Sequence, residues 1–91
     1  MTDQDDTLIR EVEALIFLSA EPVGERELAA ACEADPERIE QAIAALRDAY
    51  LPGQRGIELR ELAGGWIFAS APDTEDAARR LLAKPRTPPL S

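Results

Sequence analysis

The one thiol of this 91-residue chain belongs to Cys32, and the sequence contains no histidine. A catalytic thiolate needs a neighbouring base, and a structural zinc site needs several sulfur or imidazole ligands. Neither arrangement can be built here, so Cys32 is predicted to be a small buried residue of a helix. A lone cysteine cannot form an internal disulfide, which fits a reducing compartment.

Carboxylates are the other groups that could do chemistry. Asp3, Asp5 and Asp6 lie close together, but they lack the twelve-residue loop and distal glutamate of a calcium-binding hand. The other carboxylates fall on helix faces predicted to be exposed, where no pocket would shift a pKa for acid–base catalysis. We therefore expect no enzymatic activity, no metal and no cofactor.

Charge is unevenly distributed along the chain, whose net charge is −8. Residues 1–76 hold all 18 carboxylates and six arginines, a net charge of −12, and residues 77–91 carry +4. A DNA-binding protein commonly neutralises about six to ten phosphates, so the acidic part favours a protein partner. The basic stretch is either a solvated linker or a weak contact for nucleic acid or an acidic partner; its cations are Arg79, Arg80, Lys84 and Arg86.

The clearest predicted element is a helix over residues 35–50. Asp35 is expected to cap it with its side chain, and Pro36 suits the first helical position. Apolar residues recur at helical spacing and define one buried stripe: Ile39, Ala42, Ile43, Leu46 and Tyr50. The opposite, exposed face carries Glu37, Glu40, Gln41, Ala44 and Asp48.

A shorter helix over residues 24–32, with Leu28, Ala31 and Cys32 towards the core, precedes it. Only residues 33–35 separate the two helices, which is typical of a helix-turn-helix. The second helix of such a pair usually reads DNA with cationic and amide side chains. Here that helix presents carboxylates, so the predicted surface does not suit DNA.

A first helix is predicted over residues 6–20, ending before Pro22. Its apolar residues cover about 200° of the helical wheel, wider than the roughly 100° that one core requires. Either this helix lies centrally between several elements, or a second chain covers part of it. The residues left for such a partner are Ile9, Phe17 and Leu18.

Two short strands are predicted next, at residues 57–62 and 66–70, joined by Ala63-Gly64-Gly65. The paired glycines would supply the positive φ angles of a tight hairpin turn. Trp66 and Phe68 share one strand face. One interpretation is that both rings fill the core beneath the hairpin. The other is that they are partner-interface residues, with Trp66 near the hairpin tip as an anchor.

A last helix over residues 74–82 is expected to bury Ala78, Leu81 and Leu82. The predicted fold class is therefore α+β, mostly α: a winged helix-turn-helix of three helices, a two-stranded β-hairpin wing and a C-terminal helix. The expected organisation is a disordered acidic lead (1–6), one winged-helix domain (7–83) and a proline-rich basic linker (84–91) to an absent second domain. No apolar run approaches the ~18–20 residues of a membrane span, and the acidic start does not resemble a secretory signal, which together predict a cytoplasmic protein.

Four segments of the sequence resemble the segregation and condensation protein B family, the accessory subunits of bacterial SMC–kleisin complexes. These are residues 13–23, the helix-turn-helix around Leu28, residues 56–59 with 64–66, and residues 80–82 leading to 85–86 and 90–91. The likeness covers nearly all of the chain after residue 8.

The resemblance implies the first of two winged-helix domains, in a homodimer bound by the kleisin subunit and through it by the SMC protein. It implies a non-enzymatic role in chromosome condensation and segregation, and a nucleoid association through the complex. The alternative is a winged-helix DNA-binding transcriptional regulator. A third interpretation, a folded spacer for a second domain, also remains open.

Overall fold

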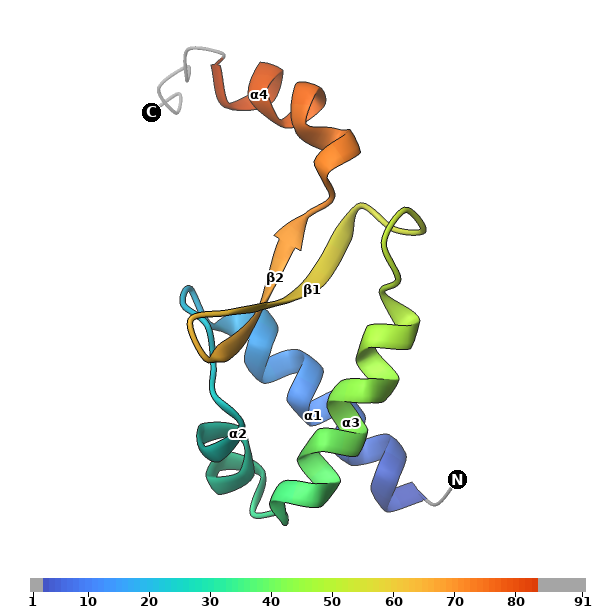
Figure 1. The fold of residues 1–91 in the computed structure, drawn as a ribbon, viewed down its shortest axis with the longest axis vertical. Coiled ribbons are helices and arrows are strands. Elements are labelled where there is room, and N and C mark those ends of the chain that lie inside the picture. The colour runs from blue at the N-terminus through green and yellow to red at the C-terminus, as the bar shows by residue number, and fades with distance from the viewer. Residues whose placement is uncertain (1–2, 84–91) are drawn as a thin grey trace, which may run out of the picture.

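The structure, a computed structural model, describes residues 3–83. Its elements are α1 (Asp3–Leu18), α2 (Glu25–Cys32), α3 (Pro36–Ala49), β1 (Ile57–Leu62), β2 (Gly65–Ser70), the 3₁₀ turn η1 (Pro72–Thr74) and α4 (Glu75–Ala83). In Figure 1, α1 and α3 cross beneath the hairpin, α2 lies beside them, and α4 stands apart beyond the open end of the hairpin. The predicted winged helix-turn-helix is confirmed.

Helix α1 begins three residues earlier and ends two residues earlier than predicted. Residues 3–6 therefore form its first turn, where acidic residues favour the positive end of the helix dipole. The helix ends at Leu18, where the Ser19 hydroxyl donates to the Leu15 carbonyl at 2.9 Å.

Helix α2 differs from the prediction in its inward face. Leu28 is fully buried and Cys32 is half-buried, but Ala31 is exposed, and Ala29 packs against the core instead. At its start, the Glu27 carboxylate accepts a hydrogen bond from the Gly24 N–H at 3.0 Å. This contact satisfies the backbone N–H of the N-cap residue, and glycine has no side chain to accept a hydrogen bond from the first turn in return.

Helix α3 lies within one residue of its predicted bounds, with Pro36 at its first position. Asp35 precedes it in extended geometry, but its side chain makes no capping hydrogen bond, contrary to the prediction. The predicted stripe is confirmed. Four of its residues are almost fully buried and Tyr50 is half-buried.

The core lies where α1, α2 and α3 meet under the hairpin. Its buried side chains are Leu8, Val12, Ile16, Leu28, Ile39, Ala42, Ile43, Leu46 and Trp66. Each nonpolar side chain removed from water contributes roughly 1.5–3 kcal/mol, so this cluster is the main source of stability.

The hairpin pairs β1 and β2 antiparallel, from Ile57 opposite Ser70 to Leu62 opposite Gly65. The turn is Ala63-Gly64, with φ of 53° and 78°, rather than the predicted pair of glycines. Gly65 begins β2, opposite Leu62, and only glycine fits there because a Cβ would lie 2.9 Å from the backbone of Pro22 and Val23. The close approach lets Val23 and Trp66 exchange two backbone hydrogen bonds of 2.8 and 2.9 Å, which fasten the wing to the α1–α2 connection.

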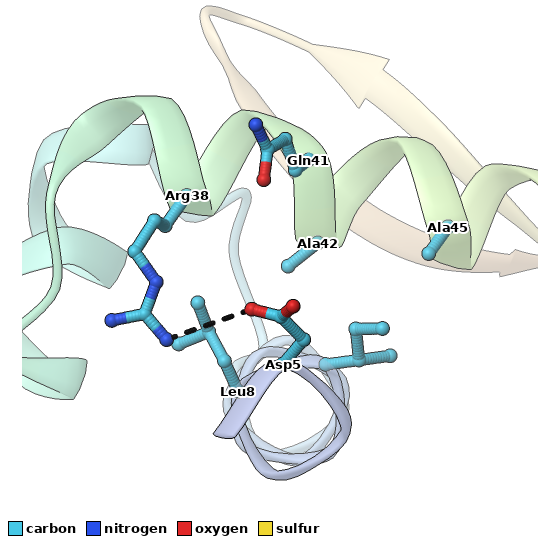
Figure 2. Close-up of a pocket in the computed structure, with 7 residues that line it drawn as sticks. Asp5, Leu8, Arg38, Gln41, Ala42 and Ala45 are labelled. Carbon is cyan, nitrogen blue, oxygen red and sulfur yellow. Dashed lines mark ion pairs between the residues drawn. The ribbon is translucent and has the colours of Figure 1, made fainter. Parts of the chain in front are cut away.

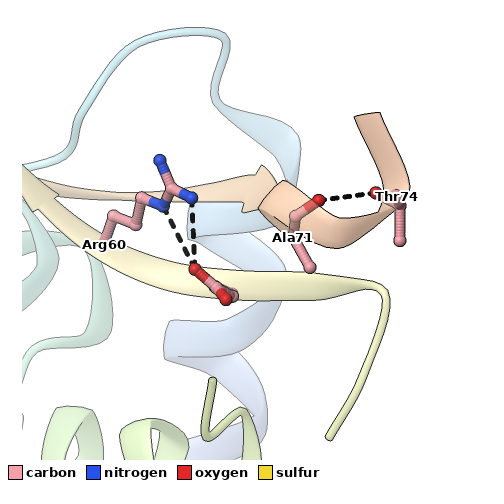
Figure 3. Close-up of polar contacts among 4 residues, drawn as sticks. Arg60, Ala71 and Thr74 are labelled. Atoms are coloured by element: carbon pink, nitrogen blue, oxygen red, sulfur yellow. Dashed lines mark hydrogen bonds and ion pairs between the residues drawn. The ribbon is translucent and has the colours of Figure 1, made fainter. Parts of the chain in front are cut away.

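A short joint connects the hairpin to α4. The Ala71 side chain is buried, its N–H donates to the Gly56 carbonyl at 2.8 Å, and its carbonyl accepts from the Thr74 hydroxyl at 2.7 Å. Figure 3 shows the Thr74 contact beside the Arg60–Glu58 ion pair of β1. These bonds fix the direction in which α4 leaves the body.

Helix α4 buries none of its residues. Leu81 and Leu82 are 73% and 75% exposed, and Ala78 is only partly covered, so the predicted burial of these residues is wrong. The spacing predicts an apolar stripe correctly, but the joint directs that stripe away from the core.

Candidate functional site

The outer face of α3 is acidic, as predicted. All five residues assigned to it are exposed: Glu37, Glu40, Gln41, Ala44 and Asp48. The two arginines of this helix point to its flanks: Arg38 lies 3.9 Å from Asp5 of α1, and Arg47 lies over the Trp66 ring at 5.5 Å. Neither cation joins the face that would meet a DNA groove, so neither arginine of α3 is placed to contact phosphates from this face.

An open, largely apolar surface is a groove between α1 and the hairpin, which we call the α1–hairpin groove. It has a volume of about 300 Å³, and its lining residues are Arg10, Glu13, Ala14, Phe17, Tyr50, Ile57 and Phe68. Phe17 is 73% exposed, and Ile57 is 39% exposed. Two exposed large apolar side chains around a concave surface are typical of a protein-binding site.

Phe68 and Tyr50 form the wall of this groove. Their ring centroids are 4.9 Å apart, and the Tyr50 hydroxyl donates a hydrogen bond to the Glu13 carboxylate. That hydrogen bond, followed by burial and the negative charge of Glu13, raises the pKa of Tyr50. The groove therefore combines an aromatic wall with charged side chains of both signs, Glu13 and Arg10.

Ile9 lies in a second, smaller hollow of about 180 Å³ between α1 and α3. Figure 2 shows Asp5 and Arg38 closing one end of this hollow and Ala42 and Ala45 lining its α3 side. Ile9 is half-buried and packs against the core. Among the predicted partner residues, Ile9 and Phe17 thus lie in two separate hollows along α1.

Trp66 is only 7% exposed and belongs to the domain core. Its indole N–H lies 3.4 Å from the Glu25 carboxylate, and Arg47 covers the ring. Of the two interpretations that the sequence left open, the structure favours core packing for Trp66. Phe68 is half-buried and lines the α1–hairpin groove, while Leu18, the last residue of α1, is 75% exposed.

The basic residues predicted to contact an acidic partner are only partly described. Arg79 and Arg80 are exposed on α4, and Arg79 pairs with Glu75 at 2.6 Å and Asp76 at 3.8 Å. Lys84 and Arg86 lie outside the described residues.

Cys32 is a half-buried thiol beside the core. Burial, with a smaller contribution from Glu11, raises the pKa of Cys32, which disfavours the reactive thiolate at neutral pH. Within residues 3–83 no cluster of His, Cys, Asp and Glu is arranged to hold a metal ion. No helix in the same range is long and apolar enough to cross a membrane.

The sequence did not reveal the groove itself. Ala14 lies in α1, Tyr50 directly follows α3 and Ile57 starts β1, and only the fold brings them together around Phe17. The wide apolar arc of the first helix was the one available signal, since it predicted apolar residues beyond those that the core can bury.

The core, the wing and the helix-turn-helix define a winged-helix domain with an apolar groove and an acidic third helix. The family described as "Segregation and condensation complex subunit ScpB" matches residues 10–91. The chain belongs to this family.

Known relatives agree with that assignment. Segregation and condensation protein B of Syntrophotalea carbinolica is 40% identical over 70 residues, which are 77% of this chain and 36% of that protein. The crystal structure of ScpB from Mycobacterium tuberculosis matches with a TM-score of 0.82 and 27% identity, over 98% of this chain and 57% of that one. A crystal structure of a dimer of the ScpB N-terminal domain complexed with an ScpA peptide matches with a TM-score of 0.77 and 26% identity, over 84% of this chain and 95% of that one. The chain spans less than half the length of the curated relatives that it matches.

Proposed function

We propose that this chain is a non-enzymatic interaction module that forms a homodimer and binds the kleisin subunit of the bacterial chromosome segregation and condensation complex. The observation that carries this proposal is the open α1–hairpin groove in a domain whose α3 face is acidic. The solved relative that is a dimer with an ScpA peptide supports it, because this chain spans 95% of that domain. Through the kleisin the chain would join the SMC protein in the cytoplasm, associated with the nucleoid.

The dimer interface that we propose is centred on Phe17 and Leu18, two large apolar residues of α1 that are 73% and 75% exposed. Phe68 contributes the groove wall, and Ile9 extends the apolar surface along α1. Trp66 acts from the core, since its backbone bonds with Val23 hold the wing in place. The exposed Arg79 and Arg80, with Lys84 and Arg86, would make at most a weak contact with an acidic partner.

Light scattering at tens of micromolar tests the dimer directly. We expect twice the chain mass of 9.9 kDa. Phe17→Asp should restore the monomer mass without unfolding, because the Phe17 side chain is 73% exposed. A wild-type chain that is monomeric at these concentrations would contradict the homodimer.

Titration with the ScpA subunit of the same organism tests the kleisin contact. We expect a complex whose mass contains two copies of this chain. A duplex-DNA gel shift at low salt is the companion measurement. Tight binding that weakens steeply with added salt would instead favour the DNA-binding regulator.

A further inference from the structure

Strand β1 pairs with β2 along one side only, and the backbone groups on its other side point away from the hairpin. Opposite residues of an antiparallel pair alternate between those that exchange backbone hydrogen bonds and those that do not. Trp66 directs its N–H and carbonyl away from β1, because both bond to Val23. Glu61, which lies opposite Trp66, therefore directs its own N–H and carbonyl away from β2.

The same alternation applies to the rest of β1. Leu59 and Ile57, two and four residues before Glu61, also direct their backbone groups outwards. The hydrogen bond from the Ala71 N–H to the Gly56 carbonyl agrees with this register. Within residues 3–83, no backbone hydrogen bond from another element reaches these outward groups, which we call the β1 edge.

A hollow of about 310 Å³ lies beside the β1 edge, between β1 and the end of α3. Its lining includes the apolar residues Tyr50, Leu51, Pro52 and Leu59 and the charged residues Arg47 and Asp48. Leu51 is 42% exposed and Leu59 is half-buried. In Figure 1, β1 lies on the side of the hairpin towards the end of α3. A chain extended along the β1 edge would direct alternate side chains towards this hollow, as Leu59 does.

We propose that an extended segment of a partner protein adds to the hairpin as a third strand along the β1 edge and inserts a large apolar side chain into the hollow beside Leu59. Donors and acceptors that recur at every second residue of a strand are matched by another extended backbone. The β1 edge runs from Ile57 to Glu61, so a segment of about five residues suffices. The proposal goes beyond the proposed function, because this contact uses neither α1 nor the homodimer.

The charged side chains of β1 are compatible with an added strand. Charges on edge strands often prevent unwanted pairing. Glu58 and Arg60, on the face of β1 opposite Leu59, form an ion pair at 3.2 Å and leave no net charge beside the incoming segment. Glu61 adds a negative charge at the turn end of the β1 edge, which favours a lysine or arginine at the matching end of the segment.

A second copy of β1 is a poorer occupant than a different segment. Two-fold antiparallel pairing of two β1 strands centred on Glu58 or on Arg60 would place like charges directly opposite each other, which is destabilising. Pairing centred on Leu59 would place the Glu61 carboxylate opposite the apolar side chain of Ile57. A segment with its own sequence avoids both conflicts.

Amide hydrogen exchange, followed by NMR, tests whether the β1 edge is open and accepts a strand. The probe is a synthetic peptide of alternating threonine and valine, with leucine at its centre and lysine at both ends. In the free chain, the Leu59 and Glu61 amides should exchange faster than the Arg60 amide, which bonds to β2. At a peptide concentration about ten times the dissociation constant, exchange at Leu59 and Glu61 should slow about tenfold. Equal protection of all three amides in the free chain, or no slowing at millimolar peptide, would overturn the proposal.

Methylation of single nitrogens of the peptide distinguishes strand addition from other contacts. A methyl group on a nitrogen that faces β1 removes a hydrogen bond and obstructs the approach, so the affinity should fall about tenfold or more. A methyl group on the next nitrogen points away from β1 and should change the affinity by about twofold at most. The effect should therefore alternate along the peptide. A scan without alternation would overturn the proposal.

Two substitutions at Glu61 form a matched pair on the protein side. The Glu61 N–H is not used within the hairpin, so Glu61→Pro removes only an outward donor, and circular dichroism should show the variant folded. Glu61→Pro should weaken peptide binding about fivefold to tenfold, whereas Glu61→Ala keeps the donor and should change it by about twofold at most. Equal binding by the two variants would contradict strand addition. If Glu61→Pro alone lowered the mass of the chain in light scattering without peptide, a second copy would occupy the β1 edge and the proposal would be overturned.

Discussion

Helices α3 and α4 are both amphipathic, yet only α3 buries its apolar stripe within the part of the chain that the structure describes. The α3 stripe contacts α1, α2 and the hairpin, and Ile39 is fully buried. The α4 stripe has the same spacing, but Leu81 and Leu82 remain exposed. Helical periodicity therefore shows that a helix has an apolar face, and it does not show whether the same chain covers that face.

The largest expected difference between these helices is in the free energy of unfolding. Ile39→Ala should lower it by about 2–5 kcal/mol, because a cavity forms in a closed core. Leu82→Ala should change it by less than about 0.5 kcal/mol, since the side chain contacts little of its own chain. Urea unfolding at a protein concentration too low for dimerisation measures both values. Similar losses for the two variants would mean that α4 packs on its own body, and the contrast between the helices would fail.

The contrast explains which parts of the fold could be predicted. Helix α3, the link of residues 33–35 and the hairpin are confirmed almost to the residue, because spacing, Pro36 and the glycines act locally. The exposure of Leu81 and Leu82 could not be predicted, since it depends on the direction in which α4 leaves the joint at Ala71.

Long-range contacts account for the other differences. Alternation places Trp66 on one face of a strand, but its burial depends on the bridge to Val23, more than 40 residues away in sequence. The α1–hairpin groove likewise needs residues from α1, β1, β2 and the end of α3. Sequence reasoning could nominate Phe17 as a surplus apolar residue, but it could not supply the wall opposite that residue.

A substitution at Gly65 tests whether the close contact between the hairpin and the α1–α2 connection stabilises the fold. Gly65→Ala places a Cβ 2.9 Å from the backbone of Pro22 and Val23, so the wing must move. We expect a loss of about 2–3 kcal/mol in the free energy of unfolding, close to the value of the two Val23–Trp66 backbone hydrogen bonds with some lost packing.

Gly56→Ala is the matched control for that substitution. A Cβ at Gly56 meets nothing within 4 Å and its φ is not positive, so stability should stay the same or rise slightly. Thermal unfolding of both variants measures the difference in their stability. If Gly65→Ala were as stable as Gly56→Ala, the wing would not be fastened to the α1–α2 connection, and its rigidity would need another source.

The smallest expected change in stability is at Tyr50, which lies between the core and the α1–hairpin groove. Tyr50→Phe keeps the ring against Phe68 but removes the hydrogen bond to Glu13, and should lower the free energy of unfolding by about 1 kcal/mol. Because that hydrogen bond raises the pKa of Tyr50 in the folded chain, its stabilising effect is complete below the ordinary value of 10.0. It is lost as the pH rises through the folded pKa.

Denaturant unfolding from pH 8 to pH 11 separates this effect from that of Cys32, whose pKa is also raised from 9.0. The wild-type chain should lose stability from both groups, and Tyr50→Phe only from the thiol, so the two curves should converge at high pH. Parallel curves would place the Tyr50 hydroxyl in water rather than on Glu13. The wall of the α1–hairpin groove would then be mobile, and a groove without a fixed shape would discriminate less between apolar partners.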